Sequence, residues 1–224
     1  MDWASIVLSI ELAVVTLIVL LPLALAVARW LGFTRIKGRP WIEGLLALPL
    51  VLPPTVIGFY LLVAMGNQTV LGQLYERVAG HTLAFSFSGL VVASVIFNIP
   101  FAVQPMQRAF EAISADLREA GQCCGLTAWQ AFWRIEMPLA WPGILSGAVM
   151  TFAHTMGEFG VVLMVGGNIP GETRTVAISI YDKVQSFNLH AAGGMALLLL
   201  VISLITIGVS YGLMERLIQR RWAP

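Results

Sequence analysis

Long apolar runs without basic or acidic side chains, separated by shorter polar segments, make up most of the chain. A helix needs about 20 apolar residues to cross the roughly 30 Å hydrocarbon core of a bilayer. Five windows approach that length, at residues 12–28, 45–65, within 81–108, at 142–165 and at 191–214. Transmembrane β-strands are only about ten residues long and alternate in polarity. The pattern therefore predicts an all-α integral membrane protein with about five transmembrane helices.

Composition agrees with a membrane protein. Of 224 residues, 58% are hydrophobic and 11% are charged, whereas about 25% are charged in a soluble domain. No linker or clear repeat divides the chain, so residues 1–224 are expected to form a single membrane domain. The two cysteines, Cys123 and Cys124, are adjacent, which argues against a disulfide framework and a spaced metal site. We expect no metal site.

The placement of the 13 basic residues indicates the orientation of the spans. Cytoplasmic segments of membrane proteins carry an excess of Lys and Arg. With the N-terminus outside and an odd number of spans, ten basic residues are cytoplasmic, and only Arg77, Arg174 and Lys183 lie outside. No Lys or Arg precedes the first window, which favours a retained span over a secretory signal. The C-terminus is thus predicted to be cytoplasmic.

Prolines and paired glycines mark several windows. Three prolines fall within residues 49–54, and others interrupt further windows. Because proline removes a backbone donor, these positions are read either as bends beside a cavity or as kinks tolerated in packed spans. Gly143 with Gly147, and Gly208 with Gly212, form G-x-x-x-G pairs, which favour close helix packing within the chain or at a dimer face.

The segment from about 107 to 141 is a long inner loop with signals for two short helices. Ser114 is placed to cap the first helix, Asp116 lies in its first turn, and Gly125 is suited to end it in the left-handed conformation.

The second short helix is expected to run through Ile135. Thr127 and Gln130 match a capping box at its start. Pro138 is expected to limit its extension. The loop is therefore predicted to be a helix, a glycine turn and a second helix.

Trp129, Phe132 and Trp133 fall three and four residues apart on the second helix, so they share one face. Two readings are open for this face. Tryptophan is common at the membrane interface, and buried aromatic side chains also anchor protein partners.

The same loop resembles the E-A-A-(three residues)-G-(nine residues)-I-x-L-P motif of the inner-membrane permeases of ABC importers. The motif positions here are Glu119, Ala120, Gly121, Gly125, Ile135 and Pro138. The sequence departs from the motif at Gly121, which replaces alanine, and at Met137, which replaces leucine. The resemblance implies a type I permease fold, with a core at about 8–212, and a coupling helix that binds a cleft of an ATP-hydrolysing subunit.

Other segments resemble the molybdate permease subunits in particular. They are residues 48–62, 85–89, 157–160 and 167–175. Sulfate and thiosulfate permeases are similar at 157–160 and 168–171, so sulfate, thiosulfate and tungstate remain alternative substrates. The resemblance implies a homodimer in the inner membrane, with two cytoplasmic ABC ATPases and a periplasmic oxyanion-binding protein.

The chain itself is not expected to be an enzyme. It has no G-x-x-x-x-G-K-[ST] segment and no Gly-Lys dipeptide, so it lacks the P-loop that holds ATP phosphates. ATP and Mg are therefore expected to be used by the partner ATPase, and the chain to bind no cofactor. Nothing points to nucleic acid. A secondary transporter is the main alternative, but it predicts inverted repeats, and none is visible.

Ionisable and polar side chains within the spans are candidates for the gate or the pathway. Glu158 follows His154 by four residues, so the two are expected to share one helix face within reach of a hydrogen bond. A carboxylate repels a dianion, so Glu158 is read chiefly as structural, at the helix end or the outer gate. The other candidates are Thr55, Asn98, Thr151 and Thr155.

Two segments are predicted outside. Residues 66–88 are read as a loop without special function. In 166–188, apolar residues at helical spacing after Thr175 predict a short helix at the outer interface. Asn168 and Arg174, which precede it, are either contacts for the binding protein or parts of a structural turn.

Overall fold

The computed structural model describes residues 1–222, and the side chains of residues 1–209 and 212. Among the described residues, three helices are long and apolar enough to cross a bilayer unbroken. They are α1 (Trp3–Phe33), α5 (Phe87–Glu111) and the Leu189–Val209 part of α11 (Leu189–Trp222). Two bent helix pairs bring the number of candidate spans to as many as five. The described elements are all helical, so the prediction of an all-α membrane protein with about five spans is confirmed.

The first bent pair consists of α2 (Arg39–Val51) and α3 (Pro54–Met65), which meet at 107°. Pro53 precedes α3 and Pro54 lies in its first turn, so neither can continue the hydrogen bonds of α2. Single prolines behave differently. Pro22, Pro49, Pro100, Pro105 and Pro142 all lie inside helices that remain unbroken. Adjacent prolines thus bend the chain, and isolated ones are tolerated.

In the second bent pair, a helix starting in the inner loop runs into a membrane span. α7 (Ala128–Ala131), the π-helix η1 (Phe132–Glu136) and α8 (Met137–Gly157) follow without a break, and α9 (Gly160–Gly166) then turns away by 62°. The prediction that Pro138 limits the second short helix is wrong. Pro138 lies in the first turn of α8, and η1 joins α7 to α8 directly.

The outer segments contain one predicted and one unpredicted helix. α10 (Val176–Gln185) confirms the helix expected after Thr175. Residues 66–88 were expected to be a loop but contain α4 (Val70–Ala79), so that expectation is wrong. The signals are local: Thr69 Oγ1 accepts a hydrogen bond from the Gly72 N–H at 3.0 Å, and Gly80 ends the helix with a φ of 77°.

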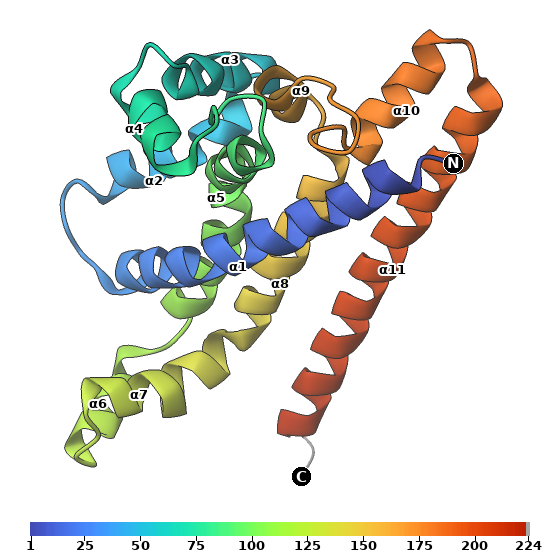
Figure 1. Cartoon of the computed structure of the whole chain (residues 1–224). Helices are drawn as coiled ribbons and strands as arrows, with labels where there is room; N and C mark the ends of the chain where they lie inside the picture. Colours follow the sequence, from blue (N-terminus) through green and yellow to red (C-terminus); the bar gives the residue numbers. More distant parts are fainter. Residues whose placement is uncertain (223–224) are drawn as a thin grey trace.

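α5 packs against both α1 and α8, and the largest group of buried apolar side chains joins these three helices. α6 (Ala115–Cys123) and α7 project beyond one end of α5, whereas α3, α4 and α9 gather near the other end (Figure 1). α11 packs mainly on α10 and α8, and only 11% of its apolar window is buried.

Two glycines allow α8 to approach α5 closely. A Cβ atom on Gly143 would come within 2.4 Å of α5, and one on Gly147 within 2.8 Å. Gly208 and Gly212 differ, since a Cβ atom on either meets no described atom within 4 Å. The predicted packing is therefore confirmed for the first pair and is absent from the described chain for the second.

We expect Gly143→Ala to lower the free energy of unfolding by about 1–3 kcal/mol, because the new methyl group overlaps the backbone of α5. Gly208→Ala is the matched control, which we expect to leave stability unchanged or slightly raised because alanine favours helix. Thermal unfolding in detergent measures both. Equal melting temperatures for the two variants would contradict close packing at Gly143.

Candidate docking segment and membrane cluster

The predicted glycine turn of the inner loop is present. α6 begins after Ser114, although the Ser114 hydroxyl accepts no backbone hydrogen bond there. Gly125 follows α6 with a φ of 77°. Its N–H donates to the Gln122 carbonyl at 2.9 Å, and the Leu126 N–H donates to the Gly121 carbonyl at 3.1 Å. These two bonds are those of a Schellman motif, which satisfies the last carbonyls of α6 and reverses the chain.

The second helix begins with the predicted capping box. The Gln130 N–H donates to Thr127 Oγ1 at 3.3 Å, and the Thr127 N–H donates to Gln130 Oε1 at 2.9 Å. The first helix then packs on the second, since a Cβ atom on Gly121 would lie 2.6 Å from Ile135 Cδ1. Two motif residues thus meet in space. We call residues 114–138 the docking segment.

The three aromatic residues of the docking segment form one group, which we call the aromatic face. The ring centroids of Trp129, Phe132 and Trp133 lie 5.0–5.8 Å apart. Trp129 is 68% exposed and Trp133 is 50% exposed, whereas Phe132 is half-buried beside a hollow between α1 and α7. Glu119 and Ala120 are exposed on α6. This surface leaves two large aromatic side chains uncovered by the described chain.

A buried carboxylate ties the docking segment to the membrane helices. Glu136 is 2% exposed, and Arg29 of α1 binds it with two hydrogen bonds, Nε to Oε2 at 2.5 Å and Nη2 to Oε1 at 3.2 Å. Arg118 of α6 is the second cation, with Nε 3.4 Å from Glu136 Oε1. The guanidinium of Arg118 lies 3.8 Å from the centroid of the Phe33 ring at the end of α1. We call Glu136, Arg29 and Arg118 the Glu136 cluster.

Sequence reasoning missed the Glu136 cluster. Arg29 and Arg118 served there only as indicators of topology, and Glu136 was one of the variable positions of the motif. The sequence signal for this cluster is an acidic residue, Glu136, directly before a long apolar helix. Such a carboxylate needs a cationic partner.

A second polar group lies within the membrane helices, where α5 meets α8. Asn98, near the middle of α5, donates from Nδ2 to the Ser94 carbonyl at 2.8 Å and to Thr155 Oγ1 at 3.1 Å. Its Oδ1 lies 3.1 Å from Nδ1 of His154. Thr155 Oγ1 donates to the Thr151 carbonyl at 2.8 Å. The structure thus brings together four of the predicted pathway residues, and with Ser94 they form what we call the membrane cluster.

The other two pathway candidates lie apart from this cluster. Thr55 is exposed on α3 and forms no hydrogen bond with the cluster. Glu158 is buried, and its Oε1 accepts a hydrogen bond from the Val161 N–H at 2.9 Å, at the start of α9. The expected pairing of Glu158 with His154 is absent because α8 ends at Gly157 and Glu158 is extended. Glu158 therefore holds the bend between α8 and α9.

The outer residues Asn168 and Arg174 bind within the chain. Asn168 Nδ2 donates to Asp182 Oδ2 of α10 at 2.7 Å, and Arg174 Nε donates to Asn168 Oδ1 at 2.5 Å. The amide and the guanidinium thus connect the turn to α10. This arrangement supports the structural alternative for these two side chains.

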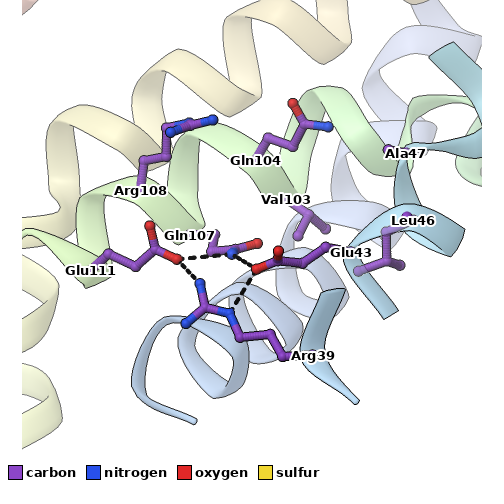
Figure 2. Close-up of a pocket in the computed structure, with 10 residues that line it drawn as sticks. Arg39, Glu43, Leu46, Ala47, Val103, Gln104, Gln107, Arg108 and Glu111 are labelled. Atoms are coloured by element: carbon purple, nitrogen blue, oxygen red, sulfur yellow. Dashed lines mark hydrogen bonds and ion pairs between the residues drawn. The ribbon is translucent and has the colours of Figure 1, made fainter. Parts of the chain in front are cut away.

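A polar hollow of about 440 Å³ between α2 and α5 was not predicted. Arg39 of α2 binds Glu43 and also Glu111 of α5, while Gln107 donates to Glu43 at 2.6 Å and to Glu111 at 2.9 Å (Figure 2). Arg108 points away from this network (Figure 2). Because α2 has no fully buried residue, these bonds help to fix it on α5.

Comparison of this sequence with known proteins shows its family. A family model described as the binding-protein-dependent transport system inner membrane component matches residues 20–224. The chain belongs to this family. The fold of this chain is similar to that of a chain in a solved bacterial ABC transporter involved in the import of alginate. The TM-score is 0.77 at 18% identity, over 95% of this chain and 78% of that one. The same fold matches that transporter in complex with a periplasmic protein, with a TM-score of 0.75.

Among curated relatives of this inner-membrane component, two are named as molybdenum transport system permease proteins ModB. The one from Azotobacter vinelandii is 49% identical over 88% of each chain, and the one from Haemophilus influenzae is 36% identical over 97% of this chain and 95% of its own. A probable sulfate transport system permease protein from Chlorella vulgaris is 26% identical over 76% of this chain and 64% of its own.

Family and structure together place the chain as a multi-pass protein of the inner membrane. Its relatives are transport components, which agrees with a membrane subunit that is not itself an enzyme. The secondary-transporter alternative is thereby set aside.

We expect Glu136→Ala to lower the free energy of unfolding by about 2–3 kcal/mol, because it leaves two arginines without their buried carboxylate. The value is below that of a fully buried pair because both arginine side chains are about a third exposed. Glu43→Ala is the matched control, and we expect a loss below about 1 kcal/mol from that partly exposed ion pair. Chemical denaturation in detergent distinguishes them. A Glu136→Ala variant as stable as the control would contradict the assigned role of Glu136.

Proposed function

We propose that this chain is the permease subunit of an ATP-driven importer that carries molybdate across the cytoplasmic membrane. The observation that carries the proposal is the docking segment, because it is rigidly built and yet presents exposed tryptophans outside the membrane helices. An exposed aromatic group of this kind suits a protein partner. Because the sequence has no P-loop, the proposal assigns ATP and Mg to that partner.

The proposed assembly contains two copies of the chain, two cytoplasmic ATPase subunits and a periplasmic oxyanion-binding protein. In the proposed orientation the N-terminus lies outside, and the docking segment and the C-terminus lie in the cytoplasm, which the distribution of Lys and Arg supports. A solved transporter of the same fold was determined with a periplasmic protein bound, which supports an external partner here.

In this mechanism, ATP-driven closure of the two ATPases moves the docking segments toward each other. Two features transmit the movement into the membrane. α7, η1 and α8 form a continuous run of helix, and the Glu136 cluster joins the same segment to α1. The membrane cluster lies further along α8, so its environment changes with the movement. Alternating access of this kind is a two-state transition biased by nucleotide and substrate.

Molybdate is favoured over sulfate because the relatives named for molybdenum transport are 49% and 36% identical to this chain, against 26% for the sulfate permease. Tungstate has the same tetrahedral shape and charge as molybdate, and it stays an alternative that the transport assay distinguishes.

We expect proteoliposomes that contain the permease and its ATPase to take up molybdate only when ATP and the binding protein are both supplied. Omission of the ATPase is the control for a secondary transporter, and tungstate and sulfate are the competing substrates. Uptake of labelled molybdate with an imposed ion gradient but without ATP would contradict the proposal. Preferential uptake of sulfate would contradict its substrate.

We expect the double substitution of Trp129 and Trp133 by alanine to weaken ATPase binding by about 2 kcal/mol per side chain, since large aromatic anchors contribute this much at interfaces. Trp3 and Trp41, which are 63% and 85% exposed outside the docking segment, provide a matched double-alanine control. The dissociation constant of the ATPase for permease in nanodiscs is the measurement. Equal affinities for the two double variants would assign the aromatic face to the membrane interface instead.

A further inference from the structure

His154 contacts two aromatic rings at the edge of the membrane cluster. Its ring stacks on Phe101, with centroids 4.0 Å apart and planes at 25°, and lies 5.0 Å from the centroid of Phe97. The side chain is only partly buried, so it reaches the surface of the chain at the depth of the membrane helices. A histidine in such a position is costly against lipid and is expected to face a polar space.

The hydrogen bonds of the cluster fix the orientation of Asn98. The Ser94 carbonyl can only accept, so the Asn98 atom 2.8 Å from it is the amide nitrogen. Asn98 therefore turns its Oδ1 toward Nδ1 of His154, at 3.1 Å. Because Oδ1 can only accept, Nδ1 of His154 carries a proton.

This assignment decides what Nε2 of His154 presents. In the neutral ring Nε2 is an acceptor, and no described residue donates a hydrogen bond to it. Elsewhere in the same cluster, the Ser94 and Thr151 hydroxyls are buried without a partner in the described chain. The cluster therefore has unused hydrogen-bonding capacity within the membrane, which is costly unless a polar species enters.

We propose that Nε2 of His154 binds the transported oxyanion, and that His154 takes up one proton from water on binding. The inference rests on the proposed function, since it assigns a residue to the passage of the same anion. A neutral Nε2 turns its lone pair toward the anion and repels it, whereas a protonated Nε2–H donates a charge-assisted hydrogen bond. Asn98 accepts from Nδ1–H in both states.

Three physical effects support this protonation. A lone imidazolium and a lone dianion each cost free energy in a low-dielectric setting, and their pairing offsets part of both costs. The faces of Phe97 and Phe101 attract a cation at the position of the ring. In addition, the Asn98 bond keeps the ring oriented, so that Nε2 points away from Asn98.

Few other charges bear on His154. On α8 and just beyond it, the nearest acidic residue along the chain is Glu158, whose carboxylate accepts a backbone bond from α9. None of the described ionisable side chains on the neighbouring elements forms a hydrogen bond or ion pair with His154. On α1, α5, η1, α10 and α11 these are Asp2, Glu11, Arg29, Arg108, Glu111, Arg134, Glu136, Tyr181, Asp182, Lys183 and His190. The proton is thus assigned to His154 and not to a neighbouring charged group.

The test is ATP-driven molybdate uptake by the complete complex in proteoliposomes, from about pH 6 to about pH 8, the range in which histidine titrates. For the native complex we expect uptake to rise as the pH falls. We expect His154→Gln to reduce uptake at the lower pH about tenfold, as the loss of one charge-assisted hydrogen bond implies, and to flatten the pH profile. His154→Arg, which is always charged, is expected to bind the anion equally well across this pH range, so uptake should have a flat profile and a rate limited by slower release.

His190→Gln is the matched control, because His190 is exposed at the start of α11. We expect this variant to keep the rate and the pH profile of the native complex. The affinity of the binding protein for molybdate, measured over the same pH range, shows how much of the pH dependence comes from that protein. Co-purification of each variant with the ATPase shows that the complex assembles. If His154→Gln does not assemble, the pH profile of His154→Arg decides alone.

A native rate and profile in His154→Gln, or a native pH profile in His154→Arg, would overturn this inference while leaving the importer assignment intact. Absence of ATP-dependent molybdate uptake by the native complex would instead overturn the proposed function itself.

Discussion

The close contact between α5 and α8 is the constraint on which the other features depend. Gly143 and Gly147 bring the two backbones together without intervening side chains. That proximity lets Asn98 of α5 reach both Thr155 and His154 of α8. It also fixes where α8 leaves the bundle, and hence where the docking segment projects. The polar membrane cluster and the position of the exposed aromatic face thus follow from one packing arrangement.

The continuity of α7, η1 and α8 gives this arrangement a mechanical consequence. A loop that was merely attached to the membrane helices would absorb a displacement of its tip. Here the second helix of the docking segment becomes the span, and the buried Glu136 holds the same point to α1 through Arg29. The π-helical turn places that carboxylate inward just before the apolar part of α8 begins. In the proposed importer, displacement at the aromatic face therefore reaches α8 as a movement of a whole helix.

Local chemistry was predictable from the sequence, and long-range pairing was not. The glycine turn at Gly125 and the capping box at Thr127 depend on neighbours within five residues, and both are present. Glu136 and Arg29 are 107 residues apart, and Asn98 and Thr155 are 57 apart, so no periodicity reveals either pair. The two errors at Pro138 and Glu158 share one cause. A helix was expected to end at Pro138 but continues, and another was expected to reach Glu158 but ends at Gly157. The end of a helix depends on the packing of the next element as well as on the residue itself.

The distribution of charge also bears on how an anion passes. The ion pairs of the described chain involve Arg39, the Glu136 cluster and Arg174, whereas the contact of α5 with the last two turns of α8 holds neutral hydrogen-bonding groups and His154. A fixed arginine there would hold a dianion tightly and slow its release, since conduction and transport require a site that can be left as well as entered. A histidine that is charged only while the anion is bound avoids this, because loss of its proton removes the attraction. In the proposed importer, selectivity among oxyanions then rests with the external binding protein, and the membrane subunit contributes passage.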